Sequence, residues 1–134
     1  MSKRATGEID AQAILTGGLP VFADDFAEDD RLNRLAELVI RKHEDILGHV
    51  EEYRIEYRWK QKGGKRNGAP TLGACGKPTG LLRHFSAADF VIWLAADHCR
   101  DGGYKPDQIE ALLFHELCHV GVPEEDEDGN EGFR

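Results

Sequence analysis

The sequence predicts a small α+β domain, and three patterns support this prediction. Apolar residues recur at helical spacing over 24–47, strand-like patterns occupy 50–97, and a second helical pattern covers 104–120. With 134 residues, the chain is long enough for one domain with its own core. The order helix, strand, strand, strand, helix therefore predicts a sheet of about three strands packed against two helices.

The composition narrows the class of protein. The chain is 40% hydrophobic and 31% charged, which is ordinary for a soluble globular protein. No apolar run reaches the ~18 residues that a membrane span needs, and the net charge of −8 disfavours a general nucleic-acid binder. Three cysteines without a disulfide-scaffold pattern, and an N-terminus without an apolar signal segment, lead us to expect reduced thiols and a cytoplasmic protein.

The first helix is expected to follow a flexible arm. Residues 1–23 show no sustained period, and we expect one docked turn there, near Ile14 and Leu15. The domain itself is expected over 24–134. Its first helix, DDFAEDDRLNRLAELVIRKHEDIL, begins with acidic residues and carries basic ones late, as the helix dipole favours, and should end near Gly48. His43 lies on the polar side of this helix, where we expect it to be solvated.

Strands are predicted in the middle of the chain. The segment VEEYRIEYRWK, residues 50–60, alternates apolar with charged side chains, which indicates a half-buried strand. The loop QKGGKRNGAP follows, and a second strand is expected over 70–77. After a turn, ADFVIWLAAD, residues 88–97, is almost continuously apolar and predicts a well-covered strand, which CRDGG ends.

The second helix, YKPDQIEALLFHELCHV, has clear boundaries. Pro106 suits its first turn, and Gly121 with Pro123 should end it. The residues around its histidines are apolar almost all round, so we expect a helix sandwiched inside the domain. The acidic segment 123–134 is predicted to form a loop.

This helix contains HELCH, an HExxH motif with His115 and His119 four residues apart. Side chains at this spacing share a helix face, so both imidazoles can point at one metal ion. Glu116 is rotated by about 100° from His115 and lies beside the pair. A zinc ion lowers the pKa of bound water towards ~7, and a neighbouring carboxylate can accept its proton. The motif therefore predicts amide or peptide hydrolysis with Glu116 as the general base.

The motif is rare enough to be informative. A shuffled chain of this composition would contain about 0.03 HExxH matches, and here the match falls within a predicted helix. Unpartnered histidine and glutamate side chains inside an apolar helix would be costly to bury. We therefore expect a metal site, the alternative being two core histidines hydrogen-bonded to backbone groups.

The stretch DFVIWLAADHCRDGGYKPDQIEALLFHELCHV resembles the corresponding stretch of the phage metallopeptidases, a family of small zincin-like proteins encoded in phage and prophage genomes. The likeness extends back through YRIEYRWKQKGGKRNG and GLLRHFSAADFVI, over about residues 50–129. It implies a minimal zincin-like fold, in which one strand of a small twisted sheet runs beside the active-site cleft. It also implies that His115 and His119 are zinc ligands and that Glu116 is the catalytic base.

The third metal ligand is the open question. Catalytic zinc usually has three protein ligands and a water, and the resemblance implies a third histidine in a downstream segment like H-D-x-E-F, which does not occur before Arg134. Either the sequence is truncated or a local carboxylate replaces this histidine; the candidates are Glu124, Glu125, Asp126, Glu127, Asp128 and Glu131. Two imidazoles also suit manganese, cobalt or nickel, so these ions are alternatives to Zn²⁺.

Other histidines and cysteines are weaker candidates. His98 and Cys99 end the third expected strand near the predicted cleft, where we favour a polar pair at the strand end over a metal role. His84 has less support still. Cys118 lies within HELCH but should point away from the histidines and pack as a small apolar residue.

A basic hairpin is predicted on this acidic protein. Arg58, Lys60, Lys62, Lys65 and Arg66 gather around the glycine-rich loop. A solvated hairpin that protects a sheet edge is the favoured interpretation, and contact with nucleic acid or an acidic partner is the alternative.

These patterns predict a zinc-dependent metallopeptidase in the cytoplasm, and the resemblance implies that the cell is a bacterial host of a phage or prophage. Its substrate would be a protein or peptide that adds to the edge of strand 90–97. The alternative is a non-catalytic or degenerate zincin-like module that binds a host or phage partner, and a third hypothesis is a protease docked on nucleic acid through the basic hairpin. No pattern predicts the oligomeric state or the cleavage specificity.

Overall fold

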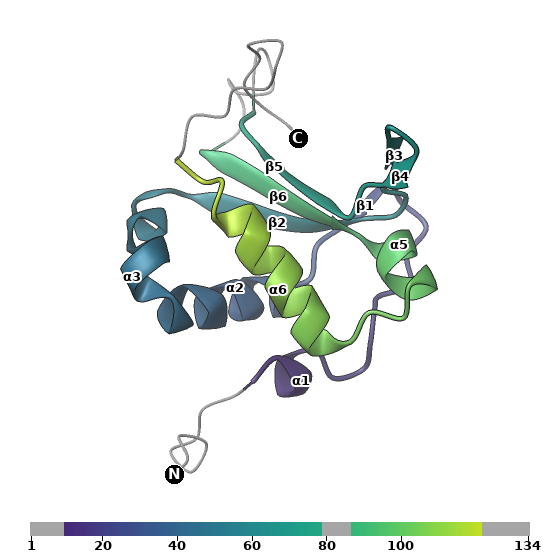
Figure 1. Cartoon of the computed structure of the whole chain (residues 1–134), viewed down its shortest axis with the longest axis horizontal. Helices are drawn as coiled ribbons and strands as arrows, with labels where there is room; N and C mark the ends of the chain where they lie inside the picture. The colour runs from purple at the N-terminus through teal and green to yellow at the C-terminus, as the bar shows by residue number, and fades with distance from the viewer. Residues whose placement is uncertain (1–9, 79–86, 122–134) are drawn as a thin grey trace.

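The computed structural model describes residues 10–78 and 87–121, which form helices packed on a mixed sheet (Figure 1). The elements, in chain order, are α1 (Ala11–Ile14), β1 (Phe26–Ala27), α2 (Asp30–Lys42), α3 (Glu44–Leu47), the 3₁₀-helix η2 (Gly48–Glu52), β2 (Ile55–Lys60), β3 (Lys65–Arg66), β4 (Ala69–Pro70), β5 (Gly73–Gly76), β6 (Phe90–Ala95), α5 (Ala96–Asp101) and α6 (Pro106–Leu117). The α+β prediction is confirmed. None of the described helices is long and apolar enough to cross a bilayer.

The main sheet has four strands in the order β1-β2-β6-β5. β2 and β6 run parallel, with Ile55 opposite Phe90, while β1 and β5 are antiparallel to their neighbours. β3 and β4 form a separate small hairpin within the predicted loop. β1 was not expected, because two residues are too few to show a strand period.

The position of β6 corrects one prediction. β6 lies between β2 and β5, so the expectation that a substrate adds to the edge of strand 90–97 is wrong. Its almost continuous apolar sequence fits a central strand, because both of its edges are hydrogen-bonded to neighbours. In the part of the chain that the structure describes, the outermost strand beside β6 is β5.

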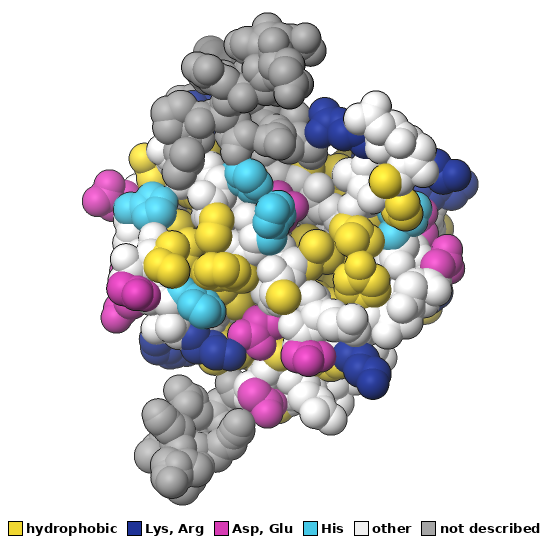
Figure 2. Space-filling view, viewed as in Figure 1, with side chains coloured by type: hydrophobic (Ala, Val, Ile, Leu, Met, Phe, Trp, Pro, Cys, Tyr) yellow, Lys and Arg dark blue, Asp and Glu magenta, His cyan; other side chains and the backbone are white. Residues whose placement is uncertain are grey.

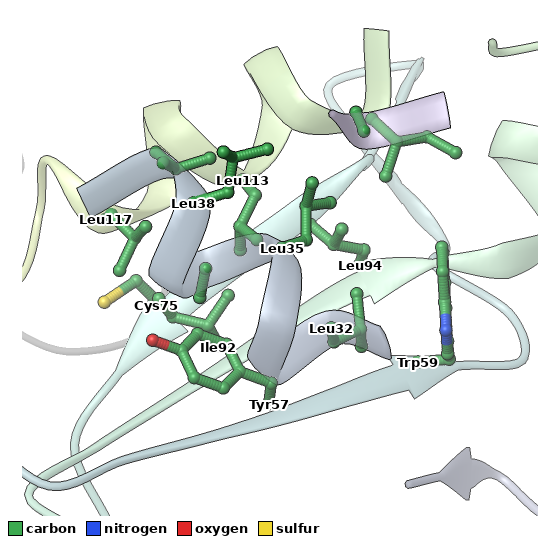
Figure 3. Close-up of a cluster of buried hydrophobic side chains, with 14 of the residues drawn as sticks. Leu32, Leu35, Leu38, Tyr57, Trp59, Cys75, Ile92, Leu94, Leu113 and Leu117 are labelled. Atoms are coloured by element: carbon green, nitrogen blue, oxygen red, sulfur yellow. The ribbon is translucent and has the colours of Figure 1, made fainter. Parts of the chain in front are cut away.

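The helices α2 and α6 pack on one face of the sheet and against each other. Buried side chains of the sheet, among them Tyr57, Trp59, Ile92 and Leu94, meet leucines of both helices there (Figure 3). The alternation predicted for residues 50–60 is confirmed over β2, where Trp59 is fully buried and its neighbour Arg58 is partly exposed. The start of the predicted strand is wrong, because η2 extends to Glu52 and β2 begins at Ile55.

The first helix is shorter than expected. It begins at Asp30 because the Asp29 side chain accepts the Arg31 backbone N–H at 3.0 Å and caps the helix. The acidic segment before Asp30, which was expected to be helical, instead contains the strand β1 and the capping residue Asp29. At His43 the backbone leaves helical geometry (φ −125°, ψ 41°), and α3 and η2 continue the chain. The expectation that His43 is solvated is only partly right, because its ring packs on Phe114 with 4.3 Å between centroids.

The expected docked turn near the N-terminus is present. Asp10 caps the short helix α1, and Ala11, Ile14 and Leu15 are buried in the core. The division into an arm over 1–23 and a domain over 24–134 stays a prediction. The three cysteines are free thiols, as expected.

Candidate metal centre

The helix α6 carries the HExxH motif, and its start follows the sequence prediction. Pro106 occupies the first turn, where its missing N–H costs no hydrogen bond. The backbone N–H of Lys105 donates to the Gln108 side chain at 2.8 Å, and the Gln108 N–H donates to the Lys105 carbonyl at 2.9 Å. The helix therefore begins at a position that its own sequence determines.

The end of α6 is tighter than a regular helix. His119 N–H donates to the Glu116 carbonyl and Val120 N–H to the Leu117 carbonyl, both at 3.1 Å, in the i to i+3 pattern of a 3₁₀ turn. Gly121 then takes a φ of +76°, which favours glycine and ends the turn as predicted. His119 thus lies just beyond the regular helix.

The structure brings His115 and His119 side by side. Their ring centroids lie 5.0 Å apart, with an interplanar angle of 83°. His115 is exposed and His119 is half-buried, and histidine side chains lie together at the surface over α6 (Figure 2). Their role as ligands stays a prediction, and this arrangement is compatible with it.

The expectation that α6 is sandwiched inside the domain is wrong. Only one stripe of the helix is buried, formed mainly by Ile109, Leu113 and Leu117, while Phe114 is half-buried. The helix forms the outer layer because the sheet lies on one side of it alone. The burial argument for a metal therefore does not apply to the exposed His115.

Glu116, by contrast, is only 5% exposed and is the one charged side chain in the core of the described residues. No buried side-chain nitrogen or oxygen atom of these residues lacks a hydrogen-bond partner, so the burial of Glu116 does not by itself require a metal. A Cβ built on Gly73 would lie 3.3 Å from Glu116 Oε2 and 2.9 Å from the Trp93 carbonyl oxygen. The carboxylate thus lies over β5, at a point where a side chain on the strand would crowd it. Sequence reasoning missed Gly73, although a glycine inside a predicted strand is a known sign of close approach.

Two residues near η2 contact the turn that carries His119. His49 Nε2 lies 2.9 Å from the Val120 carbonyl oxygen, and His49 is the donor because a carbonyl can only accept. A Cβ on Gly121 would lie 3.0 Å from the Tyr53 ring. These contacts fix the end of α6, and His49 was not singled out by any sequence pattern.

The described residues do not supply a third metal ligand beside the two histidines. Over residues 10–78 and 87–121, no three His, Cys, Asp or Glu side chains are grouped to hold a metal ion. His84 and the acidic candidates Glu124, Glu125, Asp126, Glu127, Asp128 and Glu131 lie outside the described residues. Two imidazole donors fit zinc in kind, and the third donor that catalytic zinc usually takes is not among these residues.

The other candidate side chains, His98, Cys99 and Cys118, make contacts with other parts of the fold. His98 and Cys99 lie in α5 and not at a strand end as expected; His98 Nε2 is 2.8 Å from the Gly64 carbonyl oxygen. Burial, and to a lesser extent Asp97, raises the pKa of Cys99 to about 11. Cys118 packs against the core as predicted, and burial raises its pKa. None of these side chains belongs to the histidine pair.

An α+β domain with an HExxH helix and a buried glutamate beside the histidine pair is typical of metallopeptidases. A family model described as putative phage metallopeptidase matches residues 24–133. The chain belongs to this family, as the resemblance implied. No curated protein and no solved structure matches the chain.

Proposed function

We propose that the protein is a zinc-dependent metallopeptidase, active in the cytoplasm of a bacterial host cell, with His115 and His119 as metal ligands and Glu116 as general base. The main supporting observation is the buried Glu116 carboxylate, which lies over β5 and belongs to the residue that follows His115, one of two adjacent imidazoles. The family description supports the reaction class.

The residues have separate tasks in this proposal. A zinc ion held by the two histidines would supply Lewis acidity toward a peptide carbonyl. Glu116 would accept the proton of the attacking water at a carboxylate oxygen and then deliver it to the leaving amine. The burial of Glu116 suits this task, because exclusion of bulk water strengthens its polar contacts.

The strand β5 offers a place for the peptide. The Leu72 carbonyl accepts the Ala95 N–H at 2.8 Å, so the alternation of an antiparallel pair directs the backbone groups of Gly73 and Cys75 away from β6. A peptide strand added there would pass the Glu116 carboxylate, since Gly73 is the residue beneath it. This location replaces the one expected at β6.

Elemental mass spectrometry and a peptidase assay test the proposal. Protein purified without a histidine tag is expected to contain near-stoichiometric zinc, to lose it in His115→Ala, and to keep it in His43→Ala, the matched control. Glu116→Gln should retain zinc and lose casein cleavage, detected as new peptides by mass spectrometry. Retained turnover in Glu116→Gln would exclude the general-base role.

A second candidate is a non-catalytic zincin-like module that binds a host or phage partner. It is favoured by one observation, the lack of a third ligand among residues 10–78 and 87–121. Well-folded protein without zinc or turnover would support this candidate over the first.

A further inference from the structure

An exposed basic element lies apart from the metal centre. The hairpin of β3 and β4 carries Lys65 and Arg66, and Lys62 precedes it; we call these three the hairpin cations. All three are exposed, and Lys or Arg side chains are visible over the hairpin (Figure 2). Within the described part of the chain, no carboxylate forms a salt bridge with them, in a protein whose net charge is −8.

The base of the hairpin is fixed to α5. The Asp97 carboxylate accepts the Gly63 N–H at 3.0 Å, and His98 Nε2 donates to the Gly64 carbonyl at 2.8 Å. The Thr71 N–H donates to the same carbonyl at 2.9 Å. Gly63 has no room for a side chain, because a Cβ would overlap the Thr71 carbonyl oxygen. The cations are therefore presented from a preorganised backbone, which reduces the entropy lost on binding.

Two aromatic rings lie near Lys60, on the sheet face opposite the helices. Phe26 is 47% exposed and pairs across the strands with Lys60. Trp93 alternates with the core residues of β6 and is half-buried. The Lys60 ammonium lies 4.7 Å from the Trp93 ring centroid and 5.8 Å from that of Phe26. Lys60 ends β2 and Lys62 follows two residues later, so the ammonium group that contacts both rings is close in the chain to the hairpin cations.

The acidic groups near Phe26 are only partly compensated by cations, because Asp24 and Asp25, which precede it, are exposed and form no salt bridge within the described residues. Arg58 lies 2.9 Å from Glu56 and 3.5 Å from Glu28, so these three side chains neutralise one another in part. Lys60 contacts the rings, and the hairpin cations add three further positive charges in the segment that follows β2. The surface thus combines cations with flat aromatic groups.

We propose that this surface binds single-stranded nucleic acid, with phosphates on the hairpin cations and unpaired bases stacked on Phe26 and Trp93. Basic side chains that follow the backbone, next to aromatic rings that stack on bases, are the physical basis of single-strand recognition. Stacking on these rings requires bases that are free of a duplex, and the acidic remainder of the protein disfavours the wider contact with a double helix. The proposal does not depend on the metal centre, because α6 lies on the other face of the sheet.

The proposal is tested by measuring the binding of the whole chain to a labelled 20-nucleotide oligo(dT) by fluorescence anisotropy. Substitution of all hairpin cations by glutamine should weaken binding at least tenfold and lower the slope of log K against log salt by about two, since each phosphate contact on a single strand contributes about 0.7. Arg34→Gln/Arg41→Gln/Arg54→Gln is the matched control; it removes the same charge from exposed positions elsewhere and should change affinity less than twofold.

A second variant separates stacking from charge. Phe26→Ala should weaken binding about tenfold, a typical loss for one base stack, with an unchanged salt slope. Circular dichroism checks that each variant is folded. The proposal is overturned if the wild-type protein does not bind oligo(dT), if it binds the duplex of the same length equally well, or if the control variant loses as much affinity as the hairpin variant.

Discussion

Replacement of Asp29 by alanine should destabilise the domain far more than an ordinary loss of a surface carboxylate. Its side chain caps α2 through the Arg31 N–H, forms an ion pair with the Arg31 guanidinium at 2.8 Å, and accepts the Trp59 indole N–H at 2.9 Å. Trp59 is fully buried, so its N–H has no access to water once Asp29 is gone. One side chain thus joins the start of α2 to strand β2.

The magnitude follows from these contacts. Loss of an N-cap costs about 1 kcal/mol, and a buried donor left without a partner costs about 1–3 kcal/mol. The ion pair with Arg31 joins side chains that are 20% and 11% exposed, and it adds at most about 1 kcal/mol because solvent still reaches it. Asp29→Ala should therefore lower the free energy of unfolding by about 2–4 kcal/mol and Tm by roughly 10 °C. Urea denaturation followed by circular dichroism measures the first quantity.

The effect of Asp29 should depend on pH. Burial by itself would raise the pKa of Asp29, but hydrogen bonds from Arg31 and Trp59 outweigh it and hold the pKa below its ordinary value of 3.8. A lowered pKa in the folded state means that the ionised carboxylate stabilises the fold fully above pH 3.8 and less as the pH falls through the folded-state value. The stability difference between wild type and Asp29→Ala should therefore narrow below pH 3.8.

A double-mutant cycle with Trp59→Phe isolates the buried hydrogen bond. Phenylalanine removes the indole N–H, so Asp29→Ala should cost about 1 kcal/mol in that background, the share of the cap alone. An equal cost in both backgrounds would refute the reasoning, because Asp29 and Trp59 would then contribute independently.

Two further predictions concern the candidate metal centre. Gly73→Ala should place a methyl group against the Glu116 carboxylate and reduce casein cleavage at least tenfold, while the zinc content stays constant. Unchanged turnover would show that the close approach of Gly73 to Glu116 is not needed for peptide hydrolysis. His49→Ala should remove the hydrogen bond to the Val120 carbonyl and weaken zinc affinity up to about tenfold, as measured by competition with a chelator. His49→Gln can still donate this hydrogen bond and should restore the affinity. Equal affinity in all three proteins would contradict a positioning role for His49.

The sequence by itself determined the elements that depend on local spacing. The alternation around Trp59 predicted β2, Pro106 and Gly121 marked the limits of the second helix, and the four-residue step from His115 to His119 placed their rings together. These features follow from helix and strand periods that span only a few residues. The family resemblance, which rests on the same segments, was also confirmed.

Only the tertiary structure decided how these elements are arranged. The central place of β6, the exposure of one side of α6 and the approach of Gly73 to Glu116 were not predicted. Nor was the contact of His49 with the turn after α6. These features depend on residues that are distant in the chain. Strand order and close approach result from the packing of the whole domain, and the local spacing of apolar residues carries no information about that packing.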